Sequence, residues 1–198
     1  MRRALLAALL LFGCKPAEPA PRAEPARPVS TSIATGSHAM SFHSFSAVPL
    51  GQAEPVSLAK YQGKVLLVAN TAAHCGYTPQ YRPLGAVDRK FAARGFAVLG
   101  FVSDDFGHQA GTTAEVQACS LEHRATFDQF AEVKIKRGPG QHPIFAWLTT
   151  QPGKEGEVAW NFAKFLIGKN GELLGRWPSN VAPDGPEITA AIEAALGQ

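Results

Sequence analysis

The sequence predicts an α/β fold with a central mixed sheet flanked by helices. Two observations support this prediction. Apolar runs at residues 65–69 and 96–102 enclose a helical segment, which indicates a parallel βαβ unit. Further along the chain, Asn170-Gly171 separates two more apolar runs, as expected of a hairpin, and a helical segment ends the chain.

The first half of the fold follows from the order of apolar runs and breakers. Val56–Leu58 is expected to be a short strand, and Val65–Ala69 is wholly apolar, as in a strand buried on both faces. Thr78-Pro79 resembles a helix start, with Thr as cap and Pro at the first helical position, and the helix should run toward Gly95. Phe96–Val102 is the next strand, and a right-handed crossover should join the two strands.

The second half carries equally local signals. Thr112-Thr-Ala-Glu115 is a capping-box pattern, which predicts a helix from about Thr113. His142–Thr150 suggests a short helix, and Asn170-Gly171 suits a type I′ turn between strands at 162–168 and 172–177. Residues 184–187 should start a final helix that places Ile188, Ile192 and Leu196 on one face. A parallel unit, a hairpin and a helix in this order are typical of a thioredoxin-like fold.

Cys75 lies at a chemically special place, between the carboxyl end of one strand and the amino end of a helix. The amino end of a helix carries partial positive charge, which stabilises a thiolate. Cys75 is therefore placed to react. The alternative is a small buried residue of a βα loop, since free cysteine is often buried.

Two further segments, residues 100–109 and 160–167, bear on this choice. Together with residues 63–81 they resemble the glutathione peroxidase family, in the family's order and over roughly Phe42 to Leu196. The resemblance implies that Cys75 is the peroxidatic cysteine and that Gln109, Trp160 and Asn161 complete the catalytic site. Amide and indole N–H groups can donate to the sulfur and to the departing oxygen.

The second segment departs from the usual motif Phe-Pro-Cys-Asn-Gln-Phe-Gly-x-Gln. Val102, Ser103, Asp104 and Asp105 stand where the family has Pro, Cys, Asn and Gln. A carboxylate close to the sulfur would oppose thiolate formation. The two aspartates could instead cap the loop or pair with Arg or Lys outside the pocket, and both interpretations remain open at this stage.

Cys119 is the expected resolving thiol, because in the thioredoxin-dependent, two-cysteine branch of the family a resolving cysteine occupies the matching helix. A sulfenic acid on Cys75 would condense with it to a disulfide. The helix around Ala114–Arg124 would have to unwind, since disulfide-bonded Cα atoms lie within about 7 Å. Alternatively Cys119 is a buried helix residue, and an external thiol such as glutathione resolves the sulfenic acid.

The amino terminus predicts export. Met1–Gly13 has a positive start and a short apolar run, as in a signal peptide, and Leu11-Phe-Gly-Cys14 resembles a lipoprotein box, so Cys14 is expected to carry lipid. Residues 14–40 would form a flexible Pro/Ala-rich tether, and residues 41–198 one domain. The protein should then be held on a bacterial membrane in the cell envelope. The alternatives are an ordinary exported protein and a start codon assigned too far upstream.

Charge and cysteine spacing exclude several functions. The formal net charge is +3, and removal of Met1–Gly13 leaves +1, since that segment holds Arg2 and Arg3 and no acidic residue; no basic patch indicates nucleic acid. His74 beside Cys75 lacks metal-ligand spacing, so no metal is expected. The absence of a C-x-x-C pair argues against a copper-delivering thioredoxin-like lipoprotein and against a disulfide isomerase.

The sequence therefore predicts a monomeric thiol-dependent peroxidase that reduces hydrogen peroxide or organic and lipid hydroperoxides. It needs no prosthetic cofactor, and thioredoxin or glutathione serves as the reductant. The alternatives are a peroxide sensor that uses the same cysteines, and an envelope interaction or metallochaperone module without turnover.

Overall fold

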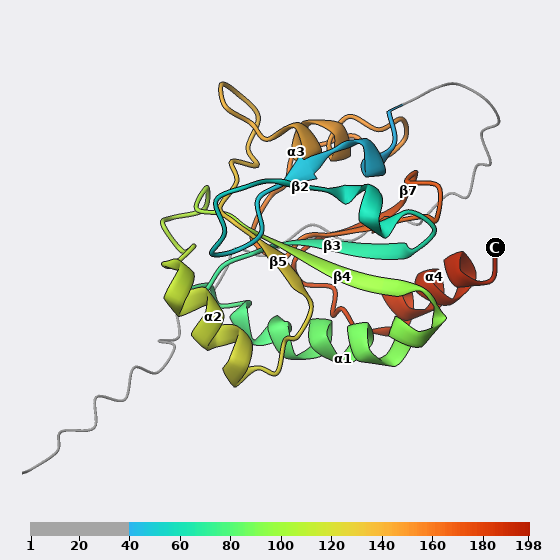
Figure 1. The fold of residues 1–198 in the computed structure, drawn as a ribbon, viewed down its shortest axis with the longest axis horizontal. Coiled ribbons are helices and arrows are strands. Elements are labelled where there is room, and N and C mark those ends of the chain that lie inside the picture. Colours follow the sequence, from blue (N-terminus) through green and yellow to red (C-terminus); the bar gives the residue numbers. More distant parts are fainter. Residues whose placement is uncertain (1–39) are drawn as a thin grey trace, which may run out of the picture.

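The computed structural model describes residues 40–198 and contains a five-stranded mixed sheet in the order β5-β4-β3-β6-β7 (Figure 1). The strands are β3 (Val65–Thr71), β4 (Phe96–Val102), β5 (Asp128–Phe130), β6 (Lys164–Ile167) and β7 (Leu173–Trp177). β3, β4 and β5 are mutually parallel, whereas β6 and β7 run antiparallel to their neighbours. The sheet is that of a thioredoxin-like fold, as predicted.

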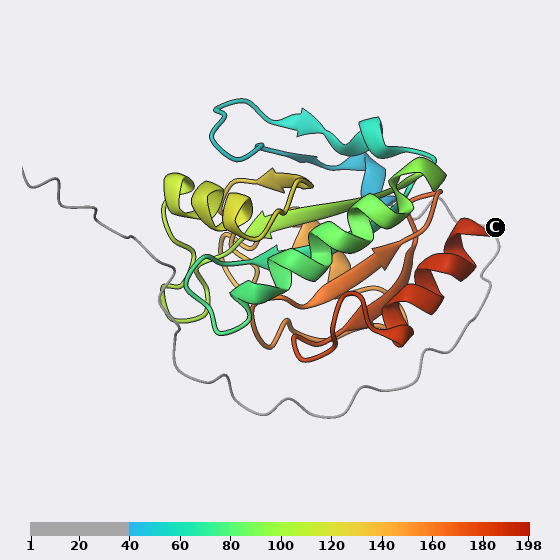
Figure 2. The same cartoon turned by 90° about the horizontal axis from the view of Figure 1, so that it is seen from below.

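Helices cover both faces of the sheet. α1 (Tyr81–Phe91) and α4 (Pro186–Leu196) lie on one face, and α3 (Pro143–Leu148) lies on the other with the small hairpin of β1 (Ser46–Ala47) and β2 (Val56–Ser57) (Figures 1 and 2). α2 (Thr113–Glu122) lies near the carboxyl ends of β3 and β4 (Figure 1). The faces of the sheet are thus covered by α1, α3, α4 and the hairpin, whereas α2 and the loops lie at the end of the sheet where β3 and β4 finish.

The apolar run of β3 supplies both cores because its side chains alternate between the two faces. Leu66 and Val68 pack in the cluster that includes α3 residues, whereas Val65, Leu67 and Ala69 pack with α1 and α4. The prediction of a strand buried on both faces is confirmed, since every residue of β3 is buried.

The helix predicted after Thr78-Pro79 is present but begins differently. A 3₁₀ turn at Thr78–Gln80 precedes α1, and a second one at Ala92–Arg94 ends the helical run before Gly95, which has a φ of 82°. The capping residue is Tyr77, so the assignment of Thr78 as cap is wrong, and Pro79 is the second residue of the turn and not the first. The Thr78 hydroxyl instead forms hydrogen bonds with the backbone of the turn that carries Cys75.

The hairpin forms at the predicted place with a different turn. Gly171 has a φ of 86°, but Asn170 is not among the residues with positive φ, whereas a type I′ turn requires positive φ at both central residues. The Gly171 N–H donates to the carbonyl of Gly168 at 2.9 Å. The amino-terminal segment covers this turn, because the Phe42 N–H donates to the Gly171 carbonyl and Ser41 Oγ to that of Asn170.

The other local predictions are confirmed with shifts of a few residues. α2 has the predicted capping box of Thr112 and Glu115, and α3 begins after His142, whose side chain accepts from the Ile144 N–H. β5 was not predicted, since a three-residue edge strand leaves little pattern. The predicted signal Met1–Gly13, Cys14 and the tether up to residue 39 lie outside the described residues.

Candidate active site

Cys75 lies in a tight turn directly beyond β3. Its side chain is a free thiol that is 3 % exposed. The backbone N–H of Tyr77 points at the sulfur, with 3.5 Å between N and Sγ. Thr78 fixes the turn, because its Oγ1 accepts from the Cys75 N–H and donates to the Ala72 carbonyl, both at 3.0 Å. The sulfur is thus held beside a backbone donor at the start of a helical run.

The segment that contains Gln109 is bonded to the Cys75 segment through the backbone. The Ala73 N–H donates to the Ala110 carbonyl at 2.9 Å, and the His74 N–H donates to the Gln109 carbonyl at 3.0 Å. These two bonds lie one and two residues before the cysteine. The segment of residues 109–110 therefore lies directly beside the segment that leads to Cys75.

Trp160 and Asn161 precede β6, in a turn that β3 holds in place. Phe162 has a φ of 64°, an uncommon conformation for a residue with a large side chain. Its N–H donates to the Asn70 carbonyl at 2.7 Å. The Asn70 side chain donates to the Trp160 carbonyl at 3.2 Å and accepts from the Ala163 N–H at 3.0 Å.

Side chains from residues 100–109 and from residues 160–167 are in contact. Asn161 Nδ2 donates to Gln109 Oε1 at 3.2 Å. Trp160 packs against the apolar cluster that contains Cys75, and its ring centroid lies 5.4 Å from that of Phe106. The Trp160 Nε1 is buried, and none of the residues from 40 onward accepts its hydrogen bond. This donor and the Gln109 amide are available to an oxygen of a substrate.

Asp104 and Asp105 bind the backbone of their own and a neighbouring loop. Asp104 accepts from the Ala110 N–H at 3.0 Å and contacts His108 Nδ1 at 2.7 Å. Partial burial acts to raise the pKa of Asp104, but the hydrogen bonds from Ala110 and His108 outweigh it, so its pKa is lowered. Asp105 accepts from the N–H groups of Ile135 and Lys136 at 2.5 and 2.9 Å. Both carboxylates therefore cap loop backbone, as one of the two alternatives predicts.

Cys119 is buried in α2 and packs with the loop that leads to Cys75. Its Sγ lies 3.7 Å from the carbonyl oxygen of Ala73, and Val116 and Ala110 belong to the same apolar cluster. The structure thus places Cys119 beside the residue two positions before Cys75, on a separate element.

Sequence reasoning missed two residues that hold the site. The sequence predicts Thr78 as a helix cap and predicts no role for Asn70. The available signal for Asn70 was a polar amide at the end of the apolar run of residues 65–69, since a fully buried polar side chain needs hydrogen-bond partners.

Replacement of Asn70 by alanine is expected to reduce both stability and peroxidase activity. It removes the amide that connects β3 to the Trp160 turn and leaves the buried Ala163 N–H without its acceptor. We expect a loss of about 2–3 kcal/mol in the free energy of unfolding, measured by urea titration. Thr71→Val, the neighbouring buried substitution, is the control. A stability equal to that of wild type would contradict the bracing role of Asn70.

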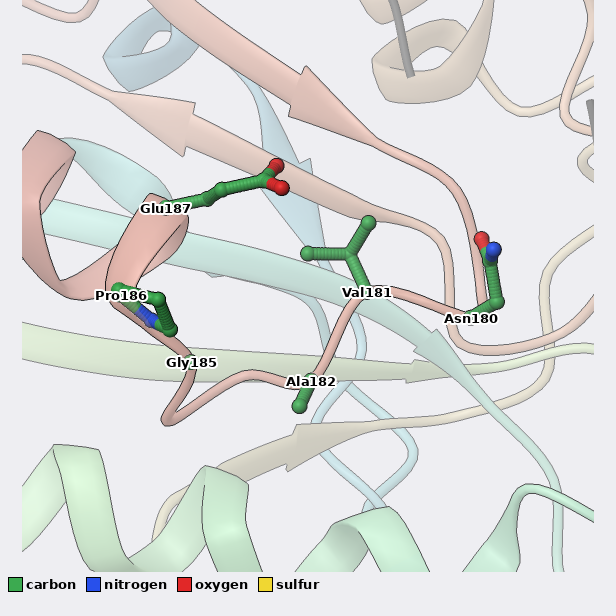
Figure 3. Close-up of a pocket in the computed structure, with 6 residues that line it drawn as sticks. All are labelled: Asn180, Val181, Ala182, Gly185, Pro186 and Glu187. Atoms are coloured by element: carbon green, nitrogen blue, oxygen red, sulfur yellow. The ribbon is translucent and has the colours of Figure 1, made fainter. Parts of the chain in front are cut away.

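The pocket drawn in Figure 3 is separate from these residues. It has a volume of about 350 Å³ and lies at the start of α4. It is lined by Asn180, Val181, Ala182, Gly185, Pro186 and Glu187. Its lining includes none of the four predicted catalytic residues. Within residues 40–198 no group of three or more His, Cys, Asp or Glu side chains could hold a metal ion.

The loop beside this pocket covers a buried lysine. Lys164 is fully buried, and its Nζ donates to the carbonyls of Ser179 and Val181 at 3.0 and 2.6 Å. Burial lowers the pKa of Lys164 from its usual 10.5 to about 7.

Stability is therefore expected to rise with pH above neutrality. Between pH 7 and 10.5 the unfolded chain keeps the Lys164 proton while the folded chain releases it, so the unfolded state binds more protons. The slope is at most about 1.4 kcal/mol per pH unit. Urea unfolding at several pH values should show this rise in wild type and in the matched control Lys169→Met. A rise that persists in Lys164→Met would refute the assignment.

A free cysteine at the end of a strand, in an apolar cluster against which Trp160 packs, on a thioredoxin-like fold, is the arrangement expected of a class of thiol-dependent peroxidases. Residues 42–149 match the glutathione peroxidase family. The chain belongs to this family. It is accordingly a peroxidase that uses a thiol reductant and not a prosthetic cofactor.

Curated relatives agree in sequence. The chain is 40 % identical over 164 residues to the hydroperoxy fatty acid reductase gpx1 of Synechocystis, which covers 78 % of this chain and 95 % of the relative. It is 31 % identical over 169 residues to the thioredoxin/glutathione peroxidase BtuE of Escherichia coli, covering 73 % and 92 %.

Solved structures agree in fold. The apo form of Trgpx matches with a TM-score of 0.66 and 34 % identity, over 81 % of this chain and 98 % of that one. The structure of T. cruzi GPX1 matches with a TM-score of 0.63 and 28 % identity, over 80 % of this chain and 97 % of that one.

Proposed function

We propose that Cys75 is the peroxidatic residue and that Gln109, Trp160 and Asn161 form the rest of the catalytic site. The observation that carries the proposal is that Trp160 packs against the apolar cluster that contains the free, buried Cys75, and that its Nε1 is buried without an acceptor in the described part of the chain. A buried polar group without a partner is costly, and a bound oxygen would satisfy it.

The first step transfers one oxygen atom to sulfur. The Cys75 thiolate attacks the terminal oxygen of a hydroperoxide, a sulfur–oxygen bond forms and the oxygen–oxygen bond breaks. The departing alkoxide or hydroxide takes a proton and leaves as alcohol or water. Cys75 is left as a sulfenic acid, oxidised by two electrons. Donors around the site stabilise the charge on the departing oxygen.

The second step uses Cys119 in its reduced form. Its sulfur attacks the Cys75 sulfenic acid, a disulfide forms and water leaves. The burial of Cys119 in α2, against Ala73, supports this role because its helix borders the Cys75 loop. We propose that α2 unwinds locally to let the two sulfurs bond, since they lie on separate elements. A dithiol reductant then restores both thiols and becomes a disulfide.

We propose a thioredoxin-type protein as the preferred reductant. The Escherichia coli relative is named a thioredoxin/glutathione peroxidase. A dithiol reductant suits a protein disulfide, because it can attack one sulfur and release itself from the mixed disulfide with its second thiol.

Organic and lipid hydroperoxides are the proposed substrates beside hydrogen peroxide. The Synechocystis relative is named a hydroperoxy fatty acid reductase. The signal-like Met1–Gly13 and Cys14 support export and lipid anchoring in the bacterial cell envelope, which would place the enzyme, proposed as a monomer, beside lipid hydroperoxides. In residues 40–198 no helix is long and apolar enough to cross a membrane.

Trapping of the intermediate tests the catalytic proposal. The reduced full-length chain is mixed with peroxide in the presence of dimedone, which captures sulfenic acids, and the peptides are analysed by mass spectrometry. The adduct is expected on Cys75. An adduct restricted to another cysteine would overturn the assignment.

The mass of the mature amino terminus from a bacterial host, in wild type and in Cys14→Ser, tests the lipid anchor.

A further inference from the structure

A contact between a histidine and a carboxylate connects the Cys75 loop to the helix that carries Cys119. His74 Nε2 lies 3.3 Å from Glu115 Oε1, and the two side chains are 39 % and 49 % exposed. His74 directly precedes Cys75 in the chain, and Glu115 lies in the first turn of α2. No role for this pair follows from the catalytic site described above.

Glu115 uses its two oxygens for two purposes. Its Oε2 accepts from the N–H and the hydroxyl of Thr112, at 2.7 and 2.8 Å, and so closes the capping box of α2. Its Oε1 faces His74. The hydrogen bonds from Thr112, with a smaller contribution from His74, lower the pKa of Glu115, so the carboxylate is anionic at neutral pH. One residue thus both caps the helix and binds the Cys75 loop.

The chain between the two partners is built to lie close. Gly111 has a φ of 78°, and a Cβ at this position would lie 2.8 Å from the Cβ of Ala73 and 3.2 Å from His74 Nε2. Only glycine fits there without displacement. The backbone N–H groups of Ala73 and His74 donate to the carbonyls of Ala110 and Gln109, which also holds the loop that carries His74 against this segment.

We propose that His74 is a positioning residue that latches the amino end of α2 to the Cys75 loop and slows the approach of Cys119 to oxidised Cys75. This inference rests on the proposed resolving role of Cys119. Unwinding of the first turn of α2 breaks the capping box and the contact with His74 together. The latch keeps the sulfenic acid of Cys75 apart from Cys119 until the turn opens, and it leaves the first oxidation step unaffected.

The rate of disulfide formation tests the latch. Full-length chain in a Cys14→Ser background is fully reduced, mixed with one equivalent of hydrogen peroxide and quenched at intervals with an alkylating reagent. Mass spectrometry then gives the sulfenic acid and the Cys75–Cys119 disulfide at each time. His74→Ala should speed disulfide formation about twofold to fivefold, the range for a half-exposed pair. The rate of Cys75 oxidation should stay within about twofold of wild type.

Further variants separate a latch from a general effect on folding. Glu115→Gln keeps a residue that can close the capping box but loses the anion, so it should act like His74→Ala, and the double variant should be no faster than either. His74→Gln keeps a donor and should restore part of the wild-type rate. Glu122→Gln, the same charge change in the last turn of α2, should have no effect.

Two failures are distinguishable. Absence of a Cys75–Cys119 disulfide in wild type would refute the resolving role of Cys119, and the latch with it. A disulfide that forms at the same rate in wild type and His74→Ala, or more slowly in the variant, would refute the latch alone.

Discussion

Cys75→Ser is expected to abolish peroxide turnover, with a loss of at least about a thousandfold in the rate of peroxide consumption. A serine hydroxyl is not ionised near neutral pH and cannot form a sulfenic acid. The measurement follows peroxide loss with a thioredoxin system and, separately, with glutathione. The remaining site residues stay in place, so any residual rate reports the uncatalysed background.

The control for this variant is its fold. Serine is close to cysteine in size, and Cys75 touches few polar groups, so circular dichroism and the melting temperature should remain near those of wild type. A folded Cys75→Ser protein with wild-type turnover would remove Cys75 from the mechanism and would move the search to Cys119.

Cys119→Ser is expected to have the second-largest effect, confined to turnover. The first oxidation of Cys75 should proceed at the wild-type rate, because Cys119 lies on α2 and not among the donors around the sulfur. Turnover with thioredoxin should fall about a hundredfold, since the protein disulfide that thioredoxin reduces can no longer form. Single-turnover oxidation and steady-state consumption, measured on the same protein, separate the two steps.

Glutathione decides the meaning of that variant. If glutathione supports wild-type turnover in Cys119→Ser, an external thiol resolves Cys75, and Cys119 is a structural residue of α2. If neither reductant sustains turnover while Cys75 is still oxidised, the two-cysteine mechanism stands.

Local patterns in the sequence were sufficient for most of the elements. β4 has the predicted bounds, and the capping box of Thr112 and Glu115 starts α2 where expected. These signals succeed because they depend on residues within one strand or one turn of helix. The type I′ turn at Asn170-Gly171 was wrong because the Gly171 N–H bonds the Gly168 carbonyl, so Lys169 and Asn170 occupy the centre of the turn and Gly171 follows it with a positive φ.

The candidate site divides in the same way. The motifs around Cys75, Gln109 and Trp160 can be recognised from the sequence alone, and the predicted order of elements places Cys75 between a strand and a helix. The destinations of Asp104 and Asp105 were not readable, since each carboxylate had two plausible sets of partners and only the folded backbone selects one.

By itself the sequence determined the family, the place of Cys75 between a strand and a helix, and the order of the helices and strands along the chain apart from β1 and β5, because each is encoded by neighbouring residues. Only the tertiary structure decided that Asn70 braces the Trp160 turn, that Lys164 is fully buried and that His74 meets Glu115. The physical reason is that these contacts join residues far apart in the sequence. Asn70 and Trp160 are 90 residues apart, Lys164 and Ser179 are 15 apart, and His74 and Glu115 are 41 apart. Such pairs acquire their environment only when the sheet and its loops come together.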